Sequence, residues 1–271
     1  MDDISATQFG RLVTESAALH FAKRLAHSEP NGAPSSAVLS NPSQQYVMEV
    51  LNHLYAVRSA VRDSESLIDQ VRIPPPEPWL REMCLNADRY RQQLLDLFTI
   101  VIHSVLDRTL LLTNVVCRLE IAPRDCSLRA IVQATLRTGL SISNELVSLR
   151  EAVLPIADAR HLFAHRGEHR DAGTFSAVQR AKLITQGMRA DTTGVVFNET
   201  GAVAELLGIM GADLRSVSAP LLRVLNKLCV PFDAALESIG GPDIPSAEEL
   251  SKAKAMIEYF AGGERPGFLS H

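Results

Sequence analysis

The residues best suited to acid and base chemistry lie together between Asp158 and His169. This stretch, Asp-Ala-Arg-His-Leu-Phe-Ala-His-Arg-Gly-Glu-His, holds three of the chain's eight histidines, two arginines and two carboxylates. A histidine, whose ordinary pKa is about 6.5, can remove a proton from a ribose 2′-hydroxyl or give one to a leaving 5′-oxygen. A neighbouring guanidinium can hold the phosphate and stabilise the charge that develops on its oxygens. These residue types therefore favour phosphodiester cleavage without a metal ion.

A helix is expected to position this cluster. Pro155 stands just before it, and because the first turn of a helix tolerates proline, the sequence predicts a new helix that begins there. At about 100° per residue, such a helix has an apolar arc and a polar arc on opposite sides. The apolar arc holds Ile156, Ala159, Leu162 and Phe163, with Arg160 at its edge, and the polar arc holds Asp158, His161 and His165. We therefore expect the polar cluster to face solvent or a partner.

The composition predicts an all-α fold around this element. Hydrophobic residues make up 46% of the chain and aromatic residues only 5%, which favours helices over strands rich in aromatic and β-branched side chains. Apolar spacing and proline breaks predict helices over residues 3–27, 44–72, 80–119, 128–136, 142–153, 200–239 and 247–260, with 80–119 the most buried and 200–239 cut at Pro220 and Pro231. The expected domains are an N-terminal helix and linker (1–43), a helical bundle (44–170), and a basic loop with a C-terminal helical extension packed on the bundle (171–271).

Charge limits where a nucleic acid can bind. The net charge of −4 gives no overall attraction for a polyanion, so any contact must come from a local basic region. The segment that follows Gly167 is such a region, because it carries several arginines and lysines against few acids. The residues that we expect to contact RNA are Arg166, Arg170, Arg180 and Lys182.

Several other functions are not indicated by the sequence. The four cysteines show no CxxC pair, which argues against a zinc knuckle or a disulfide framework and favours a reduced, cytoplasmic location. The acidic start lacks a secretory signal, and charged residues interrupt the most apolar run (94–116), so we expect a buried helix and no membrane association. No Walker A, GxGxxG or nucleophile-elbow motif occurs, and no cofactor is expected.

The six residues Arg160-His161-Leu162-Phe163-Ala164-His165 resemble the arginine, polar residue, three variable positions, histidine motif of the HEPN superfamily. The resemblance implies an up-and-down bundle over residues 44–170, with the motif near the start of its last core helix. It implies a homodimer in which two motifs face each other across a cleft, with Arg160 and His165 catalytic and His161 as the polar residue, where the family often has asparagine. The implied activity is a metal-independent endoribonuclease that leaves a 2′,3′-cyclic phosphate, in a toxin or defence setting with an antitoxin or regulatory partner.

Three alternatives remain open. The chain can be a non-catalytic helical module for dimerisation or RNA binding, because the bundle and the basic segment suit that role equally. It can be a metal-binding helical protein, because His161, His165 and His169 are each four residues apart. However, Leu162 stands where a zincin helix carries its glutamate, and Gly167 can end the helix before His169. Finally, Asp158 and Arg160 can simply solvate a surface helix.

Overall fold

A computed structural model describes residues 4–26, 41–85, 87–166, 199–241 and 245–253. Within these ranges all regular secondary structure is helical, which confirms the predicted all-α class. The elements are η1 (Ile4–Ala6), α1 (Gln8–Ala26), α3 (Pro42–Arg72), α4 (Glu77–Glu82), α5 (Ala87–Val116), η2 (Pro123–Asp125), α6 (Leu128–Arg137), α7 (Ser143–Arg166), α9 (Glu199–Lys227) and α10 (Cys229–Ser238). Residues 247–253 are also helical.

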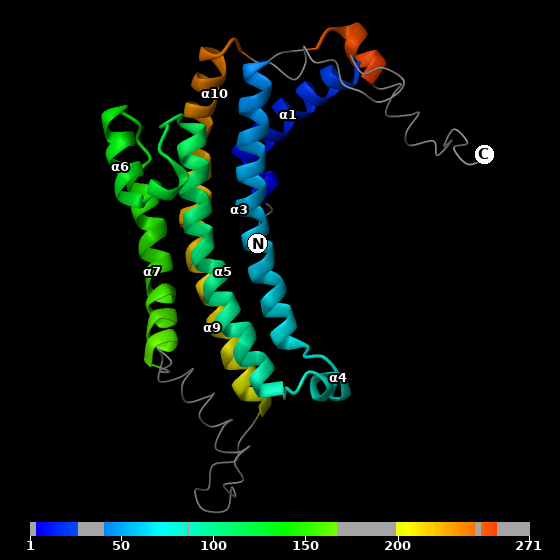
Figure 1. Cartoon of the computed structure of the whole chain (residues 1–271), viewed down its shortest axis with the longest axis vertical. Helices are drawn as coiled ribbons and strands as arrows, with labels where there is room; N and C mark the ends of the chain where they lie inside the picture. Colours follow the sequence, from blue (N-terminus) through cyan, green and yellow to red (C-terminus); the bar gives the residue numbers. More distant parts are fainter. Residues whose placement is uncertain (1–3, 27–40, 86, 167–198, 242–244, 254–271) are drawn as a thin grey trace, which may run out of the picture.

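The four long helices α3, α5, α7 and α9 form an up-and-down bundle (Figure 1). Each packs against the next in the order of the chain, and α9 packs back on α3, so the ring of helices is closed. The fourth helix, α9, comes from beyond residue 170, where the sequence predicted an extension packed on the bundle. In the structure its buried side chains belong to the same apolar core as those of α3, α5 and α7.

The core follows the apolar spacing of the sequence. Buried residues recur three and four apart along α3, as expected for helices packed side by side. They include Val47, Val50, Leu54, Val57 and Val61. The predicted start of this helix at residue 44 is confirmed to within two residues: Pro42 occupies the first turn, and the Asn41 side chain accepts a hydrogen bond from the Ser43 N–H at 2.9 Å. The helix ends before Pro74, as predicted.

The prediction of one helix over residues 80–119 is wrong, because two helices, α4 and α5, occupy this region. α4 ends at Glu82, and Cys84 then adopts a left-handed backbone with φ of 55°. The Leu85 N–H donates to the Leu80 carbonyl at 2.8 Å across this turn, a bond that satisfies an end carbonyl of α4. Met83, which falls inside the predicted helix, follows α4 directly and is 57% exposed.

Two predicted proline breaks are also wrong. No new helix begins at Pro155, since α7 is continuous from Ser143 to Arg166, and α9 likewise runs through Pro220. A proline inside a helix frees the carbonyl four residues earlier, here Glu151 and Ser216, but both residues are exposed and water can hydrate these groups. The apolar side chains on either side of each proline are buried (Val153 and Ile156 in α7, Val217 and Leu221 in α9), and their burial offsets the free energy lost with the missing hydrogen bond. The break predicted near Pro231 is confirmed, because α9 ends at Lys227 and α10 begins at Cys229.

Candidate functional site

The motif residues Arg160, His161, His165 and Arg166 all lie in the last turns of α7. Their backbone is helical, and their side chains fall outside the described part of the structure, as do all atoms of His169. The three other predicted RNA contacts also lie outside the described residues: Arg170, Arg180 and Lys182. Arg160, His161, His165 and Arg166 therefore lie on one helix, at the end of the bundle away from α10 (Figure 1).

Because α7 is continuous, its buried stripe determines the register of the motif. The stripe runs through Ile142, Leu146, Leu149, Val153 and Ile156, which alternate four and three residues apart and are at most 4% exposed. The same alternation next reaches Arg160 and then Phe163. The arc that we predicted from a helix beginning at Pro155 put Ala159 in that line and Arg160 at its edge. In the continuous helix, the sequence alternation continues to Arg160 rather than to Ala159, although the side chains from residue 157 to 166 lie outside the described part of the structure.

This register separates the two residues of the predicted catalytic pair. Arg160 and His165 are five positions apart, which corresponds to about 140° around a helix. His161 and His165 are four positions apart and share one side of α7, about 6 Å apart along the axis. No group of three or more potential metal ligands occurs among the described side chains, which do not include those of these histidines.

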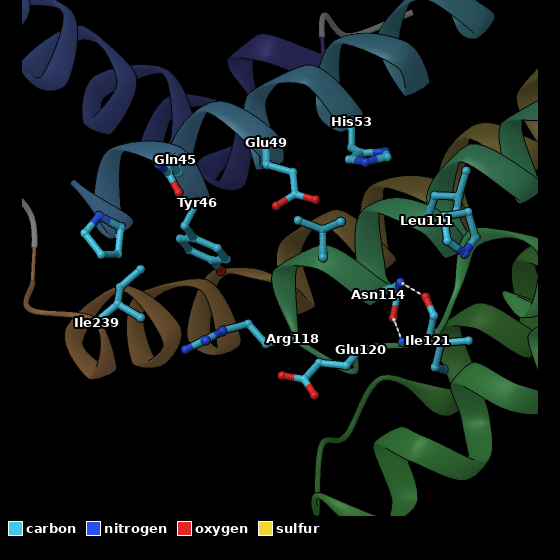
Figure 2. Close-up of a pocket in the computed structure, with 13 residues that line it drawn as sticks. Gln45, Tyr46, Glu49, His53, Leu111, Asn114, Arg118, Glu120, Ile121 and Ile239 are labelled. Carbon is cyan, nitrogen blue, oxygen red and sulfur yellow. Dashed lines mark hydrogen bonds between the residues drawn. The ribbon is translucent and has the colours of Figure 1, made fainter. Parts of the chain in front are cut away.

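A second candidate site, which sequence reasoning missed, lies at the opposite end of the bundle (Figure 2). It is an open groove with a volume of about 470 Å³, within the range of small-molecule sites. The start of α3, the end of α5, the α5–η2 loop and the end of α10 form its walls. The lining residues are Pro42, Gln45, Tyr46, Glu49, His53, Leu111, Asn114, Val115, Arg118, Glu120, Ile121, Pro123 and Ile239.

Tyr46 fixes the floor of the groove. Its hydroxyl donates to the Val116 carbonyl at 2.9 Å, and its ring stacks on Phe232 with centroids 5.6 Å apart. Burial raises the pKa of Tyr46 well above its ordinary value, and burial also raises the pKa of the neighbouring Cys117 thiol to about 12. Both groups therefore keep their protons at neutral pH. We assign them a structural role, since a nucleophilic thiol needs a lowered pKa.

The loop between α5 and η2 presents two charged residues to the groove. Arg118 and Glu120 have left-handed backbones with φ of 48° and 57°, a conformation that costs a residue with a Cβ about 1–2 kcal/mol. The Asn114 side chain braces the loop, because it donates to the Ile121 carbonyl at 2.8 Å and accepts from the Ile121 N–H at 3.1 Å. Leu119, between the two charges, packs against the core. The loop thus buries its apolar residue and directs both charged side chains into the groove (Figure 2).

Part of this groove has a signal in the sequence. Tyr46, Glu49 and His53 are three and four positions apart in α3, so they share a face that is more polar than the neighbouring core stripe. The other wall comes from Asn114, Arg118 and Glu120, more than sixty positions later in the chain. Their proximity to α3 depends on how α5 packs, and no local pattern encodes it.

The comparisons with known proteins found no match: no family model, no curated protein and no solved structure is significantly similar to this chain. Among the helices of the described ranges, none combines the length and apolar character that a membrane crossing requires.

Proposed function

We propose that this protein is a metal-independent endoribonuclease of the HEPN type, with its active residues on α7. The observation that carries the proposal is that Arg160, His161 and His165, in the spacing of the motif, lie within a single helix of an all-α bundle. In the proposed reaction, neutral His165 removes the proton of the ribose 2′-hydroxyl, and the 2′-oxygen attacks phosphorus. The bond to the 5′-oxygen breaks, this oxygen takes up a proton, and a 2′,3′-cyclic phosphate remains.

Arg160 would neutralise the charge on the non-bridging oxygens during this step. Arg160 and His165 lie five positions apart on α7, and in the HEPN-type arrangement two copies of the motif line one cleft. In the proposed dimer, the arginine of one copy and the histidine of the other act on the same phosphate. The proposal therefore requires a homodimer through this end of α7, in which His161 lies beside His165 and helps to orient it.

Contacts to the rest of the RNA would come from Arg166 and from the basic segment that follows it, through Arg170, Arg180 and Lys182. These are phosphate contacts, so they predict binding that weakens as salt concentration rises and that depends little on base sequence. A toxin or defence role with an antitoxin or regulatory partner belongs to the same proposal.

The test is cleavage of single-stranded RNA in EDTA by the wild type and by Arg160→Ala and His165→Ala. We expect wild-type cleavage and at least about 100-fold slower cleavage by His165→Ala, the usual contribution of a general base, with the helical circular dichroism signal unchanged. Arg150→Ala, an exposed arginine of the same helix, is the matched control and should cleave normally.

Other outcomes distinguish the alternatives. RNA binding without cleavage would indicate a non-catalytic helical module. Cleavage that EDTA abolishes and a divalent ion restores would instead indicate a metal site built on His161, His165 and His169. Normal cleavage by both alanine variants would overturn the assignment of the motif.

A further inference from the structure

We propose that His161 is the general acid of the cleavage reaction and gives its proton to the leaving 5′-oxygen. This inference rests on the proposed nuclease function and goes beyond it, because it gives His161 a catalytic role in addition to orienting His165. It follows from the chemistry of the bond that breaks, from the positions of the two histidines on α7 and from the residue types around them.

The cleavage step moves two protons at two different oxygens. The 2′-hydroxyl loses a proton as its oxygen attacks phosphorus, and the 5′-oxygen gains one as its bond to phosphorus breaks. The attacking and leaving oxygens lie roughly in line with phosphorus, on opposite sides of it. One imidazole therefore does not serve both oxygens in the same step. With His165 as the base, the reaction needs a second group as the acid.

The helix α7 carries a second histidine one turn from the first. α7 is continuous from Ser143 to Arg166, so His161 and His165 are four positions apart within one helix. This spacing corresponds to about 6 Å along the axis and about 40° around it. Residues four positions apart are neighbours on one face of a helix. The backbone of α7 therefore places two histidines together at the position where the motif is to bind the phosphate.

The other polar residues between Asp158 and Arg166 are of types that do not supply this proton. A guanidinium, as in Arg160 and Arg166, stays protonated in proteins. A carboxyl group of the type that Asp158 carries has an ordinary pKa of about 3.9 and is ionised at neutral pH. An imidazole, with an ordinary pKa of about 6.5, exists in both forms near neutral pH. By residue type, His161 can therefore act as the acid while His165 acts as the base.

The protons balance within this pair. The 2′-hydroxyl proton moves to neutral His165, and the 2′-oxygen forms its bond to phosphorus. The bond between phosphorus and the 5′-oxygen breaks, and the 5′-oxygen takes the proton of protonated His161. The products are a 2′,3′-cyclic phosphate and a 5′-hydroxyl. His165 is then protonated and His161 neutral, and proton exchange with water returns both to their starting forms.

The experiment compares two versions of one RNA that differ at a single linkage, placed where the wild type cleaves in EDTA. The leaving atom at that linkage is the natural 5′-oxygen in one version and sulphur in the other. Thiols ionise at a pH of about 8.5, far below alcohols, so a thiolate leaves without a proton. We expect His161→Asn to cleave the oxygen version at least about 100-fold more slowly than the wild type, the usual contribution of a general acid. It should cleave the sulphur version at close to the wild-type rate for that version.

Two further variants make this rescue specific. His165→Ala should be slow on both versions, because the base is needed whichever atom leaves. His103→Asn is the matched control, since His103 lies on α5, where its Nδ1 is 3.5 Å from an Asp107 carboxylate oxygen. This variant should cleave both versions at the wild-type rate.

The inference is overturned if His161→Asn is equally slow on both versions, because a residue that only orients His165 is needed whichever atom leaves. It is also overturned if His161→Asn cleaves the oxygen version at the wild-type rate, or if His103→Asn shows the same rescue by sulphur. In each of these cases, slow cleavage of both versions by His165→Ala leaves the nuclease proposal standing. If the wild type cleaves no RNA in EDTA, the proposed function and this inference fall together.

Discussion

The two ends of the bundle carry candidate sites of opposite kinds. At the end of α7, the chemistry-bearing residues are neighbours in the sequence, and one helix holds them together. In the groove, the charged residues come from α3 and from a loop more than sixty positions away, and the packing of α5 against α3 brings them together. The motif on α7 can be read from the sequence because its residues are neighbours in the chain. The groove cannot be read from the sequence, because its lining residues meet only after α3, α5 and α10 have packed together.

The largest effect that tests this contrast is loss of stability in alkali. Burial raises the pKa of the Cys117 thiol from 9.0 to about 12. Between these two pH values the thiol is protonated in the folded protein and deprotonated in the unfolded chain. The stabilisation is complete below pH 9 and is lost as the pH rises from 9 to 12, by on the order of 1 kcal/mol per pH unit. Chemical denaturation across this range should show the loss in the wild type and a smaller one in Cys117→Ala.

Cys84 supplies the control for this measurement, because it is an exposed cysteine next to α4. Cys84→Ala should lose stability in alkali as steeply as the wild type. Equal slopes for Cys117→Ala and the wild type would mean that water reaches Cys117 in the folded protein, and the burial assigned to the region beside Tyr46 would be wrong.

A smaller effect tests the backbone of the loop. Glycine adopts positive φ without the penalty of a Cβ, so Glu120→Gly should raise the free energy of unfolding by up to about 1 kcal/mol. The same change at Glu151, inside α7, should lower it by about 1 kcal/mol, since glycine is a poor helix former. Urea denaturation of the two variants gives the sign directly, and a loss of stability in Glu120→Gly would show that no strain is held at this position.

Local pattern was enough to predict much of the fold. The spacing of Val47, Val50 and Leu54 predicted α3. The gap predicted between helices 128–136 and 142–153 is also present, because α6 ends at Arg137 and Gly139 follows with a φ of 72°. The prolines at 155 and 220 misled, because the tolerance of a helix for proline depends on whether the freed carbonyl meets water and on how well the flanking turns pack. Those conditions are tertiary, and the sequence alone does not contain them.

The same limit explains what the sequence showed of the two sites. The motif from Arg160 to His165 could be recognised because its residues are adjacent in the chain, but the predicted helix start at Pro155 was wrong, so the buried series that leads toward the motif begins at Ile142. For the groove, only the face with Tyr46, Glu49 and His53 had a periodic signal. Glu120 is directed into the groove by a left-handed backbone that no propensity of glutamate predicts.

In the proposed dimer, Arg160 of one copy and His165 of the other form one active site, and subunit complementation is the decisive test of this proposal. Arg160→Ala and His165→Ala are each inactive in this account, but their heterodimer has one intact site of two. An equal mixture of exchanged subunits should recover about a quarter of the wild-type cleavage rate, because about half of the dimers are mixed. No recovery in a purified heterodimer, or a monomer in solution mass measurements of an active enzyme, would contradict the claim.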